Sequence, residues 1–509
     1  MQASHPMPWP MDLKIDRQSR AAIYQQIAEA LRNLILSGEL GLGARLPPER
    51  KLAASLGVNR TTVVRAYDEL AAEGLVSRWV GRGTTVTHQP DDYGRAGTSP
   101  ILWRQLFAQG AGDLSPWIQE MLQTSLRRDV IPLMAAEPSP ELFPAEEVRR
   151  LLNAALTETG SEILRYSPTE GLRPLREAIA RRMANRGAHL AWDNVLVTAG
   201  AQQGIDLLAR TFLEAGDEVA IESPTYPGAI QSFRQRGARL IAIPVDGEGM
   251  RVDVLEQALS RRSVKLVFVM PNFNNPSGAL LSRERRQRLL EVTRRYRLPV
   301  VEDDVYGEIH FEDSPPSCLV CLDPSDHVIH VSSVSKMLFP GLRVGWVAAP
   351  AAVIERLALL KQTTDLHTGT LSQWLVLQAV QTGLLDQHLL RIRPLYRERR
   401  DVLLEALVRH CGHWLTPNRP QGGINLWCRL PEGFRSRDLL VEATHMNVTF
   451  VPGETFSVHG GEQSYLRVGF GLLSLEALQE GARRLGQAIE LYSQRQRPEP
   501  VAGGARPLV

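Results

Sequence analysis

The segment Ser332-Ser-Val-Ser-Lys-Met-Leu-Phe-Pro-Gly-Leu-Arg343 decides how the larger part of this chain is interpreted. It begins at the end of an apolar run that predicts a β-strand. The amine of Lys336 can hold an aldehyde as a Schiff base if its pKa is lowered. Arg343, seven residues later, can bind a phosphate group together with the hydroxyls of Ser333 and Ser335. The segment therefore predicts a site for a phosphate-bearing aldehyde at the end of a strand.

Apolar strands alternate with helical segments on both sides of this segment, from about residue 130 to residue 490. The strand candidates are Val195-Leu-Val-Thr198, Glu218-Val-Ala-Ile221, Leu240-Ile-Ala-Ile-Pro244, Lys265-Leu-Val-Phe-Val-Met270, Pro299-Val-Val-Glu-Asp303 and Val328-Ile-His-Val331. This alternation predicts an α/β fold with a mainly parallel sheet. Ligands bind at the carboxyl ends of the strands in such sheets, and polar residues follow these strands.

Two of the polar groups fit pyridoxal 5′-phosphate (PLP). Thr198-Ala-Gly-Ala-Gln-Gln203 lies at a strand-to-helix junction, so the amides of Gly200, Ala201 and Gln202 can receive a phosphate at a helix N-terminus. Asp303 closes a strand, and a carboxylate there can keep a pyridinium nitrogen protonated. Together with the lysine, these features predict a PLP site.

The ring of PLP has three candidate neighbours. Asn275, in Asn-Pro-Ser-Gly278, and Tyr306 can donate hydrogen bonds to the phenolic oxygen, and Tyr226 offers an aromatic face for stacking. Taken singly, each has an ordinary structural explanation, because turns and packed tyrosines are common. Their order and spacing along the chain argue for the cofactor.

The N-terminal segment predicts a winged helix-turn-helix. Leu46-Pro-Pro-Glu-Arg50 supplies a rigid turn, and Gly57 ends the short helix that follows. The expected elements are a helix over residues 23–35, a short helix over 50–55, a third helix over 60–70 capped by Asn59, and a two-stranded wing over 75–86.

The third helix has the side chains of a recognition helix. Its apolar residues are spaced to pack inward: Val63, Val64, Tyr67 and Leu70. The side chains left outward in its first turns, ready for base edges and phosphates, are Arg60, Thr61, Thr62 and Arg65. Arg82 tips the wing, and residues 1–88 hold eleven Lys and Arg against eight Asp and Glu. The alternative is a small helical domain with a solvated basic face.

Residues 21–87 resemble GntR-type DNA-binding domains. The shared pattern is the turn before Leu52-Ala53, the recognition helix and a closing Gly-x-Gly-Thr wing, with Pro48 in place of a serine. The resemblance implies DNA contacts at Arg50, Arg60, Thr61, Thr62, Arg65, Arg82 and Gly83.

Residues 130–490 resemble fold-type I aminotransferases in the order Gly-Ala-Gln, Tyr-Pro, Asn-Pro-Ser-Gly, Asp-x-x-Tyr, Ser-x-Ser-Lys, Gly-Leu-Arg and Leu-Arg-Val-Gly-Phe. The whole chain thus resembles MocR-type regulators of the GntR family. The resemblance implies that Arg467 clamps a carboxylate or other acid group of the effector. It also implies that Tyr166 reaches the phosphate in the neighbouring subunit, so that a homodimer is expected.

Two functions compete. The first is a regulator that binds a double-stranded DNA operator, in which an amino-group effector displaces Lys336 from PLP and the external aldimine shifts the dimer between DNA-binding states. The second is a working PLP-dependent aminotransferase with a DNA-binding appendage, since Lys336, Asp303 and Arg467 are all present. An effector domain without PLP is a third, less favoured alternative. A winged helix has no role in transamination, which favours regulation.

Length and composition set the remaining expectations. The chain of 509 residues is 43% hydrophobic and exceeds what one core usually organises. The fold class expected is multidomain, an α+β winged helix-turn-helix followed by an α/β PLP-dependent aminotransferase-like (fold type I) domain. The expected boundaries are 14–88 for the DNA-binding domain, 89–125 for a linker, 126–490 for the PLP-binding domain and 491–509 for a disordered tail. No apolar run is long enough to span a membrane and no secretory signal is evident, so we expect a cytoplasmic protein without a membrane partner.

The four cysteines predict neither a disulfide framework nor a metal site. They are Cys318, Cys321, Cys411 and Cys428. Cys318-Leu-Val-Cys321 has the spacing of a redox or zinc pair, but no second pair and no histidine pattern completes it. We expect buried, reduced thiols.

Overall fold

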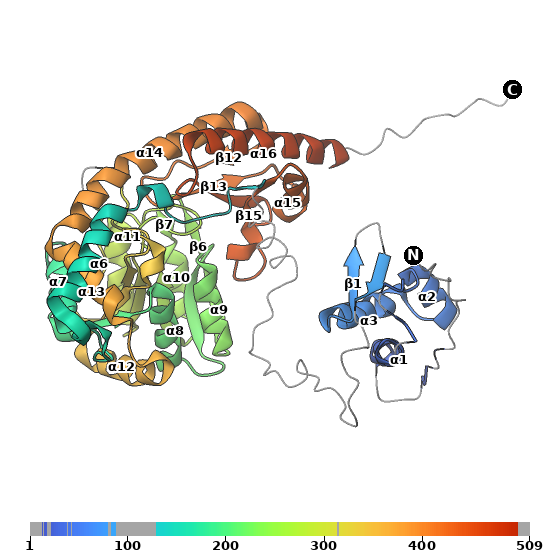
Figure 1. Ribbon diagram of the computed structural model, residues 1–509, viewed down its shortest axis with the longest axis horizontal. Coiled ribbons are helices and arrows are strands. Elements are labelled where there is room, and N and C mark those ends of the chain that lie inside the picture. The colour runs from blue at the N-terminus through green and yellow to red at the C-terminus, as the bar shows by residue number, and fades with distance from the viewer. Residues whose placement is uncertain are drawn as a thin grey trace. The chain divides into compact units, whose positions relative to one another are not determined.

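The computed structural model divides the chain into two compact units, Met1–Ala111 and Gly112–Val509 (Figure 1). The structure describes residues 13, 15–17, 22–37, 39–41, 43–79, 83–87, 129–312 and 315–496. The expected linker at 89–125 and the wing residue Arg82 lie outside the described residues.

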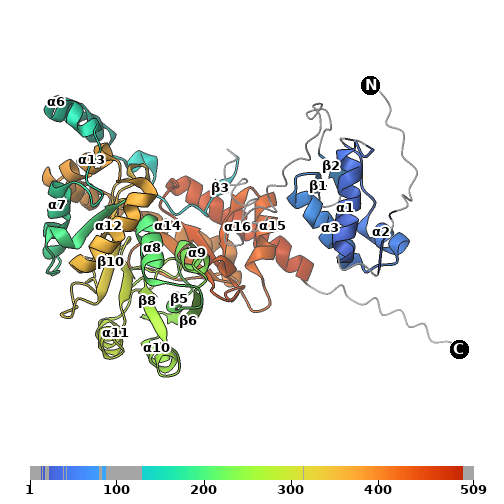
Figure 2. The ribbon, with the colours of Figure 1, turned by 90° about the horizontal axis from the view of Figure 1, so that it is seen from below.

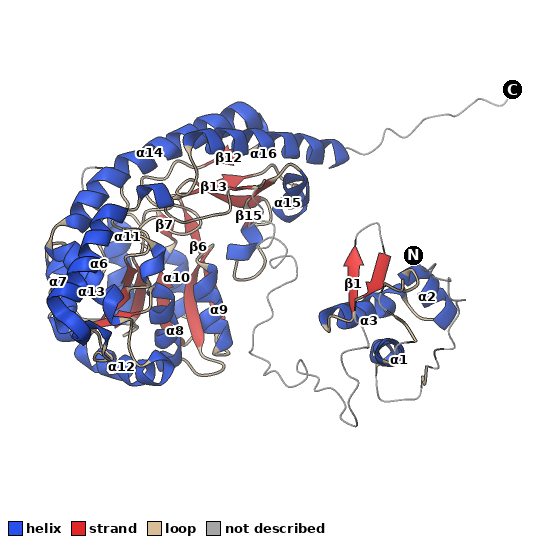
Figure 3. Cartoon of the chain, viewed as in Figure 1, coloured by secondary structure: helices blue, strands red, loops and turns tan. Residues whose placement is uncertain are grey.

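The N-terminal unit is the expected winged helix-turn-helix (Figure 3). Its elements are α1 (Ile23–Leu36), α2 (Glu49–Leu56), α3 (Arg60–Ala72) and the antiparallel strands β1 (Val76–Trp79) and β2 (Gly83–Val86). Gly57 ends α2 in the left-handed conformation with φ 61°, and the Asn59 side chain accepts a hydrogen bond from the Thr61 amide at 3.1 Å. Both predicted helix boundary signals are therefore confirmed.

The core of this unit is built from α1 and α3. Val63, Tyr67 and Leu70 are fully buried, whereas Val64, which we expected to pack inward with them, is only half-buried. The Tyr67 hydroxyl donates to the carbonyl oxygen of Pro47 at 2.8 Å. This bond fixes the Pro-Pro turn against the recognition helix.

The C-terminal unit is organised around a mixed eight-stranded sheet. In sheet order its strands are β4 (Val195–Thr198), β11 (Gly345–Ala348), β10 (Val328–Ser333), β9 (Val300–Asp303), β8 (Val264–Val269), β5 (Glu218–Ser223), β6 (Arg239–Asp246) and β7 (Gly249–Met250). All six predicted strands are confirmed. β10, β9, β8, β5 and β6 run parallel, and β11 is antiparallel to both of its neighbours.

Helices cover both faces of this sheet (Figure 2). Side chains alternate between the faces along each strand, so that Val219 and Ile221 belong to one buried cluster and Ala220 to the other. The first cluster includes residues of α8 (Ala201–Phe212) and α9 (Pro227–Gln235), and the second includes residues of α10 (Val252–Leu259) and α11 (Arg283–Arg295). Burial on both faces explains why the strands are apolar runs rather than alternating sequences.

The remaining elements flank the sheet or form a second one. The flanking helices are α6 (Ala145–Thr159), α7 (Arg173–Ala184), α12 (Ala351–Asp365), α13 (Thr370–Gln381) and the long α14 (Leu384–Cys411). The second sheet is antiparallel, with the order β12 (Thr416–Pro417), β13 (Asn425–Arg429), β16 (Tyr465–Gly469), β15 (Val451–Pro452). A short parallel pair joins β3 (Ile131–Pro132) to β14 (Val448–Thr449), and α15 (Ser436–His445) and α16 (Leu475–Gln496) complete the unit.

The final helix corrects one expectation. We expected a disordered tail from residue 491, but α16 continues to Gln496. Tyr492 is buried, its ring meets that of Phe434 at 5.2 Å, and its hydroxyl accepts a hydrogen bond from the Arg435 amide at 3.3 Å. This aromatic anchor holds the last turn of the helix.

The cysteines correct another. Cys318 and Cys321 are joined in a disulfide, so the expectation of reduced thiols there is wrong. Cys411 and Cys428 are free and buried, as expected. Within the described part of the chain, no helix has the length and apolar character needed to cross a membrane.

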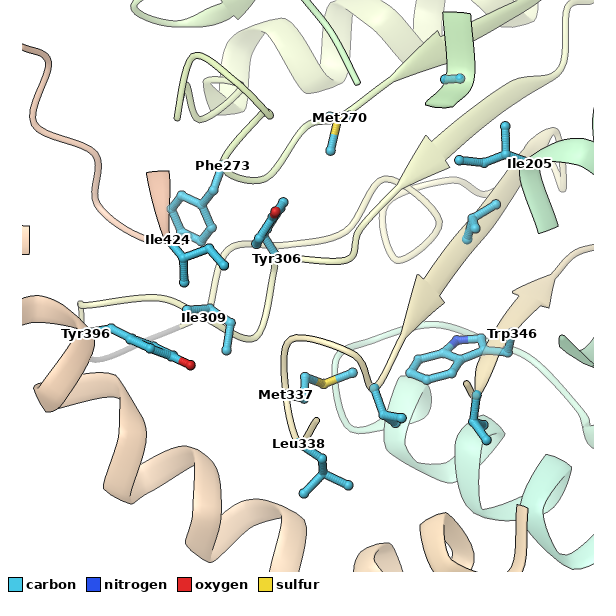
Figure 4. Packing of buried hydrophobic residues seen from close by; sticks show 14 of the residues in the cluster. Ile205, Met270, Phe273, Tyr306, Ile309, Met337, Leu338, Trp346, Tyr396 and Ile424 are labelled. Atoms are coloured by element: carbon cyan, nitrogen blue, oxygen red, sulfur yellow. The ribbon is translucent and has the colours of Figure 1, made fainter. Parts of the chain in front are cut away.

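The main buried cluster lies next to the segment that carries the predicted lysine. Met337 and Leu338 follow Lys336 directly and are buried with Ile309 (Figure 4). This packing anchors the chain immediately after the lysine. The backbone that presents Lys336 is thus fixed by the core.

Candidate functional site

A cavity of about 260 Å³ lies at the carboxyl ends of the central strands. Its lining residues are Ala136, Ala201, Gln202, Tyr226, Met270, Asn275, Asp303, Val305, Tyr306, Ser333, Ser335, Lys336, Pro340, Arg343 and Arg467. Every predicted cofactor or effector residue except Gly200 and Tyr166 lines it. The fold therefore brings together residues that are scattered over more than 260 positions of the sequence.

Lys336 is half-buried and points its amine at the backbone of another segment. Its Nζ donates a hydrogen bond to the carbonyl oxygen of Ala136 at 2.7 Å. Burial, assisted by the positive charges of Arg467 and Arg343, lowers the pKa of Lys336 to about 8. About a tenth of the amine is thus neutral, and nucleophilic, at pH 7, far more than for an ordinary lysine.

Asp303 ends β9 and is 2% exposed. Its carboxylate accepts a hydrogen bond from the Val305 amide at 3.3 Å. Burial raises the pKa of Asp303 to about 7, and the nearby carboxylates of Asp304 and Glu302 add to the shift. This environment disfavours the ionised form of Asp303. A cation placed against the carboxylate would therefore be attracted to it and would in turn stabilise its negative charge.

Gly200 and Arg343 meet behind the cavity. Gly200 caps α8 with φ 93°, and a Cβ at that position would lie 2.6 Å from Nη2 of Arg343. That nitrogen donates to the carbonyl oxygen of Ala199 at 2.9 Å. Arg343 itself adopts a left-handed backbone with φ 52°, a conformation that side chains rarely adopt and that concentrates at functional sites. Only a glycine at 200 allows the guanidinium to lie against the start of α8.

Two hydroxyls complete this corner of the cavity. The Oγ atoms of Ser333 and Ser335 lie 2.8 Å apart, and Ser333 Oγ also donates to the carbonyl oxygen of Val344 at 3.0 Å. With the amides at the start of α8 and the Arg343 guanidinium, these hydroxyls, which can rotate away from their present partners, form a cluster of polar groups suited to a phosphate.

Arg467 is buried beside the cavity at 8% exposure. Nη1 donates to Oδ1 of Asn275 at 3.1 Å and Nη2 to the carbonyl oxygen of Met134 at 2.6 Å, while the buried Nε has no partner among the described residues. Burial lowers the pKa of Arg467 to about 10, so the guanidinium stays charged at neutral pH. An unsatisfied buried donor on a cation favours an acidic ligand.

The two tyrosines of the cavity remain protonated. Burial raises the pKa of Tyr306 to about 12 and raises that of Tyr226 above its usual value. Both hydroxyls are therefore hydrogen-bond donors at neutral pH.

Tyr166 does not reach the cavity of its own chain. It is 84% exposed, and its ring meets the edge of the His367 ring at 5.5 Å. The sequence does not predict the segment at 134–136, whose carbonyl oxygens accept hydrogen bonds from Arg467 and Lys336. Backbone acceptors leave no signal in residue type, so the sequence offered no means of finding them.

The first turns of α3 present part of the predicted DNA-binding set. Arg60, Thr61 and Arg65 are exposed, and Thr62 is half-buried. Arg60 pairs with Glu49 at 3.0 Å, and the guanidinium of Arg65 lies 3.9 Å from the centre of the Tyr24 ring. These contacts hold Arg60 against α2 and Arg65 against α1.

A groove of about 850 Å³ lies beside this helix. Its lining residues are Arg45, Leu46, Pro47, Pro48, Glu49, Arg50, Lys51, Leu52, Ser55, Arg60, Gly83 and Thr84. It contains the predicted Arg50, Arg60 and Gly83, together with Arg45 and Lys51, which were not predicted. Arg45 precedes the Pro-Pro turn and pairs with Thr85 of the wing through an isolated β-bridge. The sequence signal that could have identified both residues is their positive charge, close to the predicted short helix over 50–55.

Two protein families match the two units. Residues 23–86 match the model of bacterial regulatory proteins of the gntR family, and residues 128–485 match that of class I and II aminotransferases. The second match covers most of the chain.

Individual relatives are of both kinds. The chain is 38% identical to the 2-aminoadipate transaminase of Thermus thermophilus over 77% of this chain and 98% of that protein. It is 32% identical to the probable rhizopine catabolism regulatory protein MocR of Rhizobium meliloti, over 94% of this chain and 96% of that protein. Among solved structures, LysN, the α-aminoadipate aminotransferase of Thermus thermophilus complexed with N-(5′-phosphopyridoxyl)-L-leucine, matches with a TM-score of 0.73 and 37% identity, over 77% of this chain and 99% of that chain.

Proposed function

Since this chain belongs to the class I and II aminotransferase family and carries a GntR-type domain, as MocR-type regulators do, we propose that it is a PLP-dependent transcription regulator. The observation that supports this proposal is that one chain carries a winged helix-turn-helix and a cavity lined by eleven of the predicted cofactor and effector residues. An effector that carries an amino group would be sensed in the cavity, and DNA would be bound by the N-terminal unit.

The residues of the cavity fit PLP. When bound, PLP supplies an aldehyde that condenses with primary amines and a ring that withdraws electrons. Two features would not be required by an apolar packing role: the space that Gly200 leaves for the Arg343 guanidinium, and the buried, unsatisfied Nε of Arg467.

Each group of residues has one task in this proposal. Ser333, Ser335, Arg343 and the amides of Gly200, Ala201 and Gln202 bind the phosphate, and Asp303 holds the proton on the ring nitrogen. Tyr306 and Asn275 donate to the phenolic oxygen, and Tyr226 stacks on the ring.

The effector is expected to be a small molecule with both an amine and an acid group. The amine must reach the position that Lys336 Nζ takes, and a carboxylate or sulfonate would satisfy the guanidinium of Arg467. Binding at both points places the effector between the two sheets of the C-terminal unit, because Lys336 follows β10 and Arg467 lies in β16.

A homodimer completes the proposal. Tyr166 is exposed and does not line its own cavity, which fits a residue that binds the phosphate in the neighbouring subunit. Two winged helices held by one dimer would read two DNA half-sites at a fixed spacing. The effector would then change the spacing between the two winged-helix domains of the dimer rather than the affinity of each domain for DNA.

A working aminotransferase is the second candidate. It is favoured by the intact set of Lys336, Asp303 and Arg467 and by the similarity to a transaminase. The proposal of regulation is preferred because the GntR-type unit has no part in transamination.

Absorbance and DNA binding measured on the same samples test the proposal. The wild-type protein with PLP should show a visible band that Lys336→Ala lacks, and candidate amino acids should change both the band and the operator footprint. Continuous turnover with a keto acid, without any change in the footprint, would favour the aminotransferase. Retention of the band, and of its sensitivity to borohydride, in Lys336→Ala would refute the assignment of the lysine.

A further inference from the structure

A chain of hydrogen bonds runs from the start of α8 to a buried lysine. Gln203 lies in the first turn of α8, and its Oε1 accepts a hydrogen bond from the Ala199 amide at 2.7 Å. Its Nε2 donates to Oδ2 of Asp365, the last residue of α12, at 2.7 Å. The side chain of Gln203 thus bridges the loop before α8 and the end of a second helix.

Asp365 is held from its other side by Lys361. The Nζ atom of Lys361 donates to Oδ1 of Asp365 at 2.7 Å, and Lys361 is 0% exposed. An ammonium group that is buried without a partner is strongly unfavourable, so Lys361 constrains the carboxylate of Asp365 to this position. The orientation of the Gln203 side chain is fixed in turn, because its Nε2 donates a hydrogen bond to the carboxylate of Asp365.

The backbone fixed in this way leads directly into the amides that line the cavity and contacts the Arg343 guanidinium. Ala199 donates its N–H to Gln203, and its carbonyl oxygen accepts from Nη2 of Arg343. The next residue along the chain is Gly200, and the amides of Ala201 and Gln202 follow. A shift of the Ala199 backbone would therefore move both Arg343 and the N-terminus of α8.

We propose that Gln203, Asp365 and Lys361 form a positioning relay that sets the phosphate-binding amides and guanidinium of the cofactor site. The relay rests on the proposed function, because the phosphate in question is that of PLP. None of the three side chains lines the cavity. They act through the Ala199 peptide and Arg343, as groups behind a binding site do when they hold its donors in place.

A purely stabilising role for these residues predicts a different outcome. The pair of Lys361 and Asp365 could simply stabilise the contact between α12 and α8. A stabilising role would affect all ligands of the cavity equally, whereas a relay that positions phosphate donors should affect only ligands that carry a phosphate. PLP and pyridoxal differ in that group alone.

Titration of the cofactor-free protein with PLP and with pyridoxal distinguishes the two roles. Gln203→Leu should weaken the affinity for PLP about tenfold, because the Ala199 amide loses its acceptor, and should change the affinity for pyridoxal less than twofold. The matched control is Gln257→Leu on α10, which lies exposed on the other face of the sheet and should leave both affinities unchanged.

A second pair of variants keeps the test independent of Gln203. Asp365→Asn leaves one oxygen to serve both Gln203 and Lys361, so the preference for PLP over pyridoxal should fall. Adding Lys361→Met removes the competing donor, and the double variant should recover most of that preference. Thermal melting of each cofactor-free variant checks that it is folded.

Each outcome bears on a different part of the proposal. Equal weakening of PLP and pyridoxal, or no weakening of PLP in Gln203→Leu, would overturn the relay and leave the proposed function intact. Failure of the double variant to recover would overturn the role of Lys361 and Asp365. A wild-type protein that binds neither aldehyde would overturn the proposed function, and the relay with it.

Discussion

Replacement of Gly200 by alanine tests the phosphate corner of the cavity most directly. Two costs follow from the structure. The backbone at Gly200 has φ 93°, and an L-residue there costs about 1–2 kcal/mol of the free energy of unfolding. The new Cβ would lie 2.6 Å from Nη2 of Arg343, so the guanidinium must leave the carbonyl oxygen of Ala199.

The second cost falls on the cofactor. Loss of one hydrogen bond to a charged group is worth about 1.5–3 kcal/mol, which weakens PLP binding about ten- to a hundredfold. Absorbance titration of the cofactor-free protein with PLP measures this loss, and thermal melting measures the loss of stability.

Gly216 provides the matched control. Its φ is 95°, but a Cβ there would meet no atom within 4 Å. Gly216→Ala should therefore show a similar loss of stability with unchanged PLP affinity. The reasoning is refuted if Gly200→Ala binds PLP as the wild type does, or if Gly216→Ala loses PLP to the same extent.

Three further predictions concern charge. Burial raises the pKa of Asp303 from 3.8 to about 7, so the cofactor-free folded state keeps a proton that the unfolded chain loses. The free energy of unfolding should therefore fall as the pH rises between these two pKa values, and melting curves of Asp303→Asn should show a shallower fall. In Arg467→Met, the affinity for amino acids should drop about a hundredfold while that for simple amines changes little, and equal losses in competition titrations would exclude the acid clamp. Arg60→Ala with Arg65→Ala should weaken operator binding by about 1–3 kcal/mol at fixed salt, and a mobility shift identical to the wild type would remove α3 from the DNA contact.

The fold was predictable where burial leaves a continuous apolar signal. The six parallel or near-parallel strands of the large sheet are apolar runs, because helices cover both faces. β11 (Gly345–Ala348) was not predicted, because it directly follows the Pro340–Leu342 turn of the lysine segment, and that segment was interpreted for its chemistry rather than as the start of a strand. In the second sheet, β12 and β15 have only two residues each, and the charged Arg429 and Arg467 interrupt the apolar residues of β13 and β16, so none of these strands stood out as an apolar run.

The candidate site was predictable where side chains supply the chemistry. Lys336, Asp303 and Arg467 were found from residue type and spacing, and the fold brings them to one cavity. The carbonyl acceptors of Met134 and Ala136 were not found, because any residue type supplies a carbonyl. The end of α16 was not predicted because it depends on a contact between the rings of Tyr492 and Phe434, which are far apart in sequence.

The exposure of Tyr166 has a genetic consequence. If each cavity is completed by the tyrosine of the neighbouring chain, a dimer that pairs a Lys336→Ala chain with a Tyr166→Phe chain holds one site with both defects and one with none. Cells that carry both alleles should then recover part of the regulation that neither allele supports alone. Such complementation between alleles would reveal the shared site without purification of the protein.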